Sequence, residues 1–180
     1  MAQQKLRRLD AEALWAYALR ALSSRAHSIS ELRDKLLRRA EREADIEGVL
    51  ARLKRYGYLD DRRLAESYTT SRLENEGLGR LRVLRDLRRK RIAPALAEQA
   101  VREAYRETDE VRLIEGFLER KYRKIPLKAY LAEPRHLASA YRRLRLADFS
   151  SGPVIQVLKR YAEQAETLES LEPGEEEASR

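Results

Sequence analysis

The chain contains no cysteine, one methionine, one tryptophan, seven glycines and five prolines among its 180 residues. Without cysteine there are no disulfides and no thiolate metal sites, which agrees with a reducing compartment. The scarcity of glycine and proline disfavours long loops and extended structure. No apolar run approaches the roughly 18 residues of a membrane span, and the start MAQQKLRRLDAEAL lacks the apolar core of a signal peptide. We therefore expect a cytoplasmic protein without a membrane segment.

What the chain has instead is leucine, alanine and charge. Hydrophobic residues make up 43% of the sequence and charged residues 38%. This mixture is typical of helices that bury one apolar stripe and leave the opposite face in water. The predicted fold class is all-α.

Charge is unevenly distributed along the chain. The net charge is +8, although residues 162–180 hold seven glutamates and one arginine, so the rest of the chain is strongly basic. Such a body favours a polyanionic partner, either nucleic acid or an acidic protein surface. The alternative is that the positive charge serves only the general solubility of the protein. We expect residues 163–180 to form an acidic, frayed C-terminal tail.

Apolar residues at helical spacing predict nine helices in three groups of three. The helix ends recur as LKRY at 53–56, REAY at 102–105 and LKRY at 158–161, and most of the extra length of the third group falls in a loop predicted at 125–133. Helix triplets at a near-constant period indicate a repeat array. We predict an elongated, curved array of three three-helix repeats, residues 1–59, 60–107 and 108–162.

Three helix starts carry specific signals. Ser28 and Glu31 have the spacing of a capping box. Asp45 is predicted to cap the third helix, because an aspartate oxygen can accept from free backbone amides. Pro94 is predicted to be the first residue of the sixth helix.

The stretch GYLDD, residues 57–61, marks the predicted junction between the first two repeats. Gly57 can adopt the left-handed conformation that ends a helix, and Tyr58 and Leu59 then fold back onto the last turn. Asp60 or Asp61 is predicted to cap the helix that follows.

Basic residues cluster in the middle helix of each repeat. In the second repeat, Arg82, Arg85 and Arg89 are predicted to form an outer stripe with Arg88 and Lys90 beside it, suited to bidentate contacts with phosphates or carboxylates. If the middle helices align, the repeats form one basic track, whereas a merely solvated face is the usual fate of a single cluster. The other predicted members of this surface are Arg33, Lys35, Arg39, Arg135, Arg142 and Arg143.

The sequence offers no catalytic constellation, metal site or cofactor site. His27 and His136 are isolated, and capping accounts for the paired aspartates. Tyrosines on or near the apolar stripes are expected in the core with their hydroxyls at its rim. Tyr130, in the predicted loop, is the only good candidate for stacking on a base, which argues against dedicated single-strand recognition. The expected core tyrosines are Tyr17, Tyr56, Tyr58, Tyr68, Tyr105, Tyr122, Tyr141 and Tyr161.

Three motifs in a fixed order resemble the RecX family of bacterial recombination regulators. They are SISELRDKL, the GYLDD corner followed by R-x-A-x-x-Y, and the basic helix GRLRVLRDLRRKRI, within a match over about residues 13–105. The family commonly has glycine where Ala40 and Arg91 stand. These two residues therefore predict helices that lack a left-handed cap and run on.

The resemblance implies tandem three-helix repeats, no catalysis, and binding to the RecA recombinase. RecX-like proteins are understood to lie in the groove of the RecA filament on single-stranded DNA. There they reduce strand exchange, ATP hydrolysis and the stimulation of LexA self-cleavage, and so act on DNA repair and the SOS response. We expect a monomer that binds the filament, with possible contact to single- or double-stranded DNA. The alternatives are a free-standing DNA-binding module that only competes for DNA, and an adaptor for an unrelated acidic protein.

Overall fold

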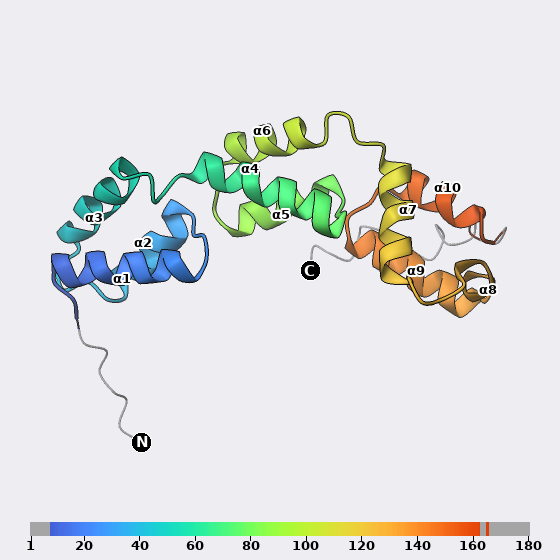
Figure 1. Ribbon diagram of the computed structural model, residues 1–180, viewed down its shortest axis with the longest axis horizontal. Helices are drawn as coiled ribbons and strands as arrows, with labels where there is room; N and C mark the ends of the chain where they lie inside the picture. Colours follow the sequence, from blue (N-terminus) through green and yellow to red (C-terminus); the bar gives the residue numbers. More distant parts are fainter. Residues whose placement is uncertain (1–7, 163–164, 166–180) are drawn as a thin grey trace, which may run out of the picture. The chain divides into compact units, whose positions relative to one another are not determined.

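The computed structural model describes residues 8–162 and residue 165, and the predicted acidic tail otherwise lies outside this part of the chain. The described residues form an all-α fold, as predicted, without a β-strand (Figure 1). One isolated backbone bridge joins Leu9 to Ala40. The elements are α1 (Ala11–Ser24), α2 (Ile29–Leu37), α3 (Ala44–Arg55), α4 (Asp61–Ser71), the π-helical turn η1 (Arg72–Glu76), α5 (Arg80–Arg89), α6 (Pro94–Ala104), α7 (Glu110–Lys121), α8 (Leu127–Leu131), α9 (Pro134–Leu146) and α10 (Ser151–Lys159).

The chain divides into two compact units. Among the described residues, unit 1 holds 8–69 and 84–103, and unit 2 holds 70–83, 104–162 and 165. The core of unit 1 forms where the apolar stripes of α1, α2 and α3 meet, because residues three or four apart share one helix face. Its fully or almost fully buried members include Leu14, Ala18, Leu32, Leu36, Leu50 and Leu53.

Unit 2 has its own core between α7, α9 and α10. Ile114, Leu137, Leu144 and Phe149 are among its fully buried or nearly buried residues. The structure corrects one prediction here, because the segment expected to be a loop forms the short helix α8. Leu131 at the end of α8 is fully buried, so this segment adds to the core instead of looping over the surface.

Helix starts agree with the sequence in two of three cases. The Ser28 hydroxyl accepts from the Glu31 N–H at 3.1 Å while the Glu31 carboxylate accepts from the Ser28 N–H, which confirms the capping box. Pro94 is the first residue of α6, as predicted. The prediction for Asp45 is wrong. Helix α3 already begins at Ala44, so Asp45 lies within its first turn and pairs with Arg42 at 2.9 Å.

Helices α3, α5 and α9 end in the same backbone arrangement, with a left-handed residue after the last turn. Gly57 is left-handed with φ of 72°, as predicted, and the Tyr58 N–H reaches back to the Leu53 carbonyl at 3.0 Å. Arg91 is also left-handed, with φ of 56°, so the prediction that α5 runs on is wrong. The Ile92 N–H bonds to the Leu87 carbonyl at 3.2 Å, and burial of the Ile92 side chain favours the turn.

The same arrangement closes α9, where Asp148 has φ of 59° and the Phe149 N–H bonds to the Leu144 carbonyl at 3.2 Å. Helix α2 ends at Leu37, before Ala40, so Ala40 does not lengthen it either. The Ala40 N–H bonds to the Leu36 carbonyl.

Candidate functional site

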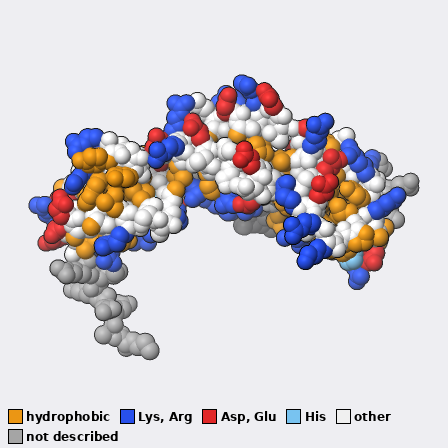
Figure 2. Space-filling view, viewed as in Figure 1, with side chains coloured by type: hydrophobic (Ala, Val, Ile, Leu, Met, Phe, Trp, Pro, Cys, Tyr) orange, Lys and Arg blue, Asp and Glu red, His pale blue; other side chains and the backbone are white. Residues whose placement is uncertain are grey.

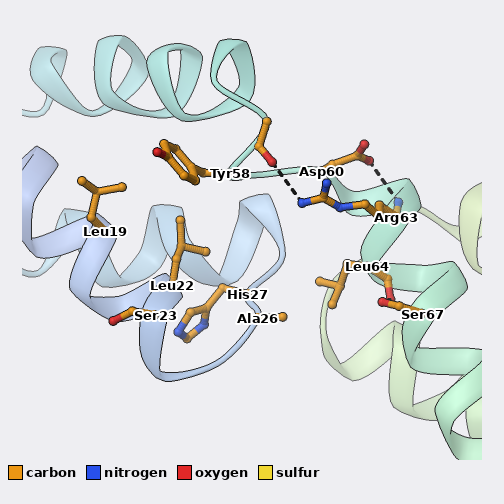
Figure 3. A pocket seen from close by; sticks show the side chains of 11 residues that line it. Leu19, Leu22, Ser23, Ala26, His27, Tyr58, Asp60, Arg63, Leu64 and Ser67 are labelled. Atoms are coloured by element: carbon orange, nitrogen blue, oxygen red, sulfur yellow. Dashed lines mark hydrogen bonds between the residues drawn. The ribbon is translucent and has the colours of Figure 1, made fainter.

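The GYLDD junction lies within unit 1 and uses its two aspartates differently. Asp60 caps α4, because its carboxylate accepts from the N–H groups of Arg62 and Arg63 at 2.9 and 3.1 Å. Asp61 does not cap α4; it accepts from the N–H of Ile29, the first residue of α2, at 2.8 Å. The Gly57 carbonyl accepts from the Arg63 guanidinium at 3.0 Å, and Figure 3 shows this bond beside the Asp60 cap.

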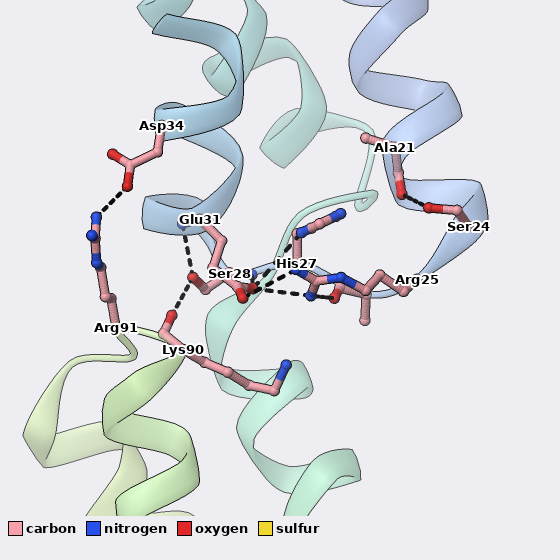
Figure 4. A network of polar contacts seen from close by, with 10 residues as sticks. Ala21, Ser24, Arg25, His27, Ser28, Glu31, Asp34, Lys90 and Arg91 are labelled. Atoms are coloured by element: carbon pink, nitrogen blue, oxygen red, sulfur yellow. Dashed lines mark hydrogen bonds and ion pairs between the residues drawn. The ribbon is translucent and has the colours of Figure 1, made fainter. Parts of the chain in front are cut away.

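A second tie within unit 1 joins α2 to the end of α5 (Figure 4). The Ser28 hydroxyl donates to the Lys90 carbonyl, and the Arg91 guanidinium pairs with Asp34 of α2. Burial favours the neutral form of Glu31, but the Ser28 N–H and Arg25 outweigh it and hold the Glu31 pKa below its usual value. The capping box that starts α2 therefore also fixes the place where α5 ends.

These ties gather seven of the predicted basic residues into unit 1. On α5, Arg85, Arg88 and Arg89 are exposed. The Lys90 ammonium lies 5.2 Å from the centroid of the Tyr68 ring and is half-buried. The remaining three belong to α2 or follow it, and all three are half-buried: Arg33, Lys35 and Arg39.

Arg82 differs from the prediction. It belongs to unit 2 and is half-buried, and its guanidinium donates to the Leu146 carbonyl at 3.1 Å. The outer stripe expected from helical periodicity therefore lacks a fully exposed residue at this position, since Arg82 bonds to the end of α9 within unit 2. The other three predicted residues of unit 2 are exposed on α9: Arg135, Arg142 and Arg143.

Acidic neighbours partly neutralise the exposed arginines. Arg88 lies 3.9 Å from Glu98, Arg89 lies 3.8 Å from Asp86, and Arg135 lies 2.9 Å from Glu133. The pairs of Arg88 and Arg135 are exposed on both sides, and such pairs contribute only about 0–1 kcal/mol, so a polyanion can replace their acidic partners at little cost. Figure 2 shows arginine and lysine side chains at the surface of both units, with acidic side chains among them.

Aromatic residues are where sequence reasoning fails most clearly. Tyr130 is not a free loop residue; it is half-buried and stacks on His136, with ring centroids 3.9 Å apart and planes 8° apart. Tyr56 and Tyr58, expected in the core, are 56% and 55% exposed and lie beside Trp15. Their exposure could have been predicted from their position, because they follow Leu53, the last buried residue of α3, and lie on either side of a left-handed glycine. The other tyrosines expected in the core are buried or half-buried: Tyr17, Tyr68, Tyr105, Tyr122, Tyr141 and Tyr161.

An open cavity of about 410 Å³ lies in unit 1 beside the junction (Figure 3). Leu19 and Leu22 of α1, Tyr58, and Leu64 of α4 contribute to its walls. His27 also lines it, with a side chain 1% exposed and an Nδ1 atom that has no hydrogen-bond partner. Burial, followed by the charge of Arg25, lowers the His27 pKa and so favours the neutral ring.

Within residues 8–162 and 165, no group of three or more histidines or acidic residues has an arrangement that could hold a metal ion. None of the helices in that part of the chain combines the length and hydrophobicity that crossing a bilayer requires. The arrangement that the structure does offer is a set of basic and aromatic side chains fixed on helices, which suits binding.

Comparison with known proteins agrees with the architecture. Residues 15–53 match the family model for the first three-helix domain of RecX, and residues 60–101 match the model for its second three-helix domain. The regulatory protein RecX of Deinococcus radiodurans is 34% identical over 159 residues, which cover 88% of this chain and 73% of that protein. The regulatory protein RecX of Pelodictyon phaeoclathratiforme is 32% identical over 142 residues, which cover 79% of this chain and 81% of that protein.

Solved structures show the same fold. The crystal structure of RecX from Lactobacillus salivarius superposes with a TM-score of 0.60 at 21% identity, and the match covers 84% of this chain and 96% of that one. The fold and the matched domain models define an all-α protein of tandem three-helix repeats. The chain belongs to the RecX family, as its motifs predicted.

Proposed function

We propose that this protein is a negative regulator of RecA that binds in the groove of the filament formed by RecA on single-stranded DNA. It inhibits strand exchange, ATP hydrolysis and LexA cleavage there, and so modulates DNA repair and the SOS response. Membership of a family of regulatory proteins supports the choice of partner. We further propose that it acts in the cytoplasm, as a monomer and without catalysis.

The proposed binding surface is supported by the hydrogen bond and the ion pair that join α2 to the end of α5. Because Ser28 bonds to the Lys90 carbonyl and Arg91 pairs with Asp34, the basic residues at the end of α5 are held on one body with those of α2. Arginines fixed in this way can form bidentate bonds with carboxylates or phosphates. Several weak contacts made at once then add up to useful affinity for a filament with many identical subunits.

The test replaces Arg85, Arg88 and Arg89 together with glutamate. We expect inhibition of RecA strand exchange to be lost while the far-ultraviolet circular dichroism spectrum stays helical. A matched control variant changes three other exposed arginines, Arg20, Arg102 and Arg112, to glutamate and alters the net charge equally. If the two variants inhibit alike, the surface assigned on α5 is wrong.

The uneven charge of the chain also supports a second candidate, a free-standing DNA-binding module that affects recombination only by competing for DNA. In that case binding to naked DNA is tight and falls steeply with salt, and excess DNA abolishes inhibition. Under the proposed function, inhibition persists when preformed filaments are challenged with excess free DNA. The order-of-addition experiment therefore separates the two candidates.

A further inference from the structure

Unit 1 places three aromatic rings side by side, of which Tyr56 and Tyr58 are exposed and Trp15 is half-buried against the core. Trp15 of α1 lies 6.0 Å from Tyr56 and 6.5 Å from Tyr58, measured between ring centroids, and the two tyrosines are 6.4 Å apart. More than half of the surface of each tyrosine is open to solvent. We call these three residues the aromatic cluster.

Folding of unit 1 accounts for the position of Trp15, which packs against the core, but not for the exposure of the two tyrosines. The Gly57 turn needs only one apolar residue to return to the core, and Leu59, which is 3% exposed, does so. Leu53 already covers the buried side of the last turn of α3. Large exposed aromatic side chains grouped in this way mark a contact surface more often than a structural one.

Cations surround the aromatic cluster. The Arg52 guanidinium lies 4.1 Å from the centroid of the Trp15 ring, and the Arg55 guanidinium lies 5.3 Å from that of Tyr56. Lys54 is exposed on the same last turn of α3. Glu12 pairs with Arg52 at 3.3 Å, but both side chains are well exposed and the pair is weak.

We propose that the aromatic cluster binds the bases of single-stranded nucleic acid, while Arg52, Lys54 and Arg55 bind the phosphates. Exposed aromatic faces interleaved with cations are the combination that single-strand binding proteins use without reading sequence. The ring planes are inclined to one another by 44–65°, so they present faces in different directions. A single strand can turn successive bases to meet such faces, whereas bases stacked inside a duplex cannot.

This site goes beyond the proposed function, because it requires no RecA and does not use the arginines of α5. Tryptophan, tyrosine and arginine are also the residues that dominate protein interfaces. The cations around the rings favour a polyanion with aromatic groups of its own. The experiment therefore has to distinguish binding of single-stranded nucleic acid from binding of a protein partner.

Trp15 is the only tryptophan of the chain, so its fluorescence reports on this site directly. We expect a saturable change in Trp15 emission when the whole protein is titrated with an oligothymidylate. An abasic oligonucleotide of the same length carries the same phosphates without bases, and it should bind more weakly and leave the emission unchanged. Equal binding of both oligonucleotides, or binding of the thymidylate without any change in emission, overturns the proposal.

Variants of the tyrosines give an independent readout. Replacing Tyr56 or Tyr58 with leucine removes the π face and should weaken oligothymidylate binding roughly 5- to 150-fold, as loss of one stacked base does. Replacement with phenylalanine keeps the ring and should leave affinity within roughly twofold, if stacking carries the binding. The Arg85, Arg88 and Arg89 triple variant should retain the change in emission, so this test stays distinct from that of the proposed function. A Trp15 response to RecA filaments but not to free oligonucleotide shows that the cluster is a protein contact and overturns the proposal.

Discussion

The Asp61 carboxylate accepts a hydrogen bond from the Ile29 N–H at 2.8 Å, across 32 residues of sequence. Ile29 is the first residue of α2 and Asp61 the first of α4, so this bond joins two helix starts within unit 1. The free amides at a helix start favour a nearby carboxylate. Burial raises the Asp61 pKa, and the hydrogen bond from Ile29 offsets part of that rise.

Replacing Asp61 with alanine leaves the partly buried Ile29 N–H without its acceptor. We expect the free energy of unfolding to fall by about 1–3 kcal/mol, measured by urea denaturation followed by circular dichroism. Asparagine at this position keeps an acceptor oxygen, so the Asp61→Asn variant should lose less than the alanine variant. Equal stability of the alanine variant and the wild type would show that the bond is not formed in solution.

The left-handed backbone at Gly57 and at Arg91 predicts opposite effects of two substitutions on stability. Gly57→Ala meets no atom within 4 Å, so its cost is the backbone strain of a side chain at positive φ, about 1–2 kcal/mol. Arg91→Gly removes that strain and should raise the midpoint of thermal unfolding. Because Arg91 also pairs with Asp34, the Asp34→Ala variant measures the loss of the pair alone. A lower midpoint for Arg91→Gly than for Asp34→Ala would contradict the assignment of strain.

Gly79 lies where unit 2 leaves no room for a side chain. A Cβ atom there would lie 2.7 Å from the Asp148 carbonyl oxygen and 2.8 Å from that of Ala147. Because both obstacles are backbone atoms, Gly79→Ala should cost several kcal/mol, roughly the 4–5 kcal/mol of exceptional substitutions. Gly48→Ala is the matched control: its Cβ has open space within α3, and it should stabilise the protein by about 0.5–1 kcal/mol. Thermal unfolding of both variants checks the contrast.

His27 should make stability depend on pH. Its folded pKa lies below the ordinary value because of burial and then Arg25, with Lys35 and Lys90 adding to the effect and Glu31 opposing it. Since the folded state binds the proton more weakly than the unfolded state, the contribution is complete above about pH 6.5 and is lost as the pH falls. The free energy of unfolding should fall more between roughly pH 7 and pH 5 in the wild type than in the His27→Leu variant. Parallel pH profiles would contradict this.

Periodicity and capping signals predicted the all-α fold, because each depends on residues close together in sequence. The Ser28 capping box, the Pro94 helix start and the left-handed Gly57 all follow from local chemistry of this kind. The exposure of Tyr56 and Tyr58 could not be predicted in the same way. A tyrosine beside an apolar stripe is expected in the core unless its neighbours in the folded protein are known. Arg91 and Asp148 escaped prediction because burial of the next residue overrides the preference of these positions for glycine.

Likewise, helical spacing predicts where Arg82 points but not that a distant carbonyl, that of Leu146, lies within reach of its guanidinium. For the same reason, helical spacing does not predict that Asp61 accepts a hydrogen bond from the start of α2 rather than from its own helix, α4. In both cases the deciding partner is more than 30 residues away.

The recurring turn at Gly57, Arg91 and Asp148 ends α3, α5 and α9 through local contacts. Leu59, Ile92 and Phe149 are then buried within two residues of the left-handed position. A change of length elsewhere is absorbed where it occurs, as α8 illustrates between α7 and α9 in unit 2. For protein engineering, these turns are natural points at which one helix can be lengthened, shortened or exchanged without altering the helix that follows.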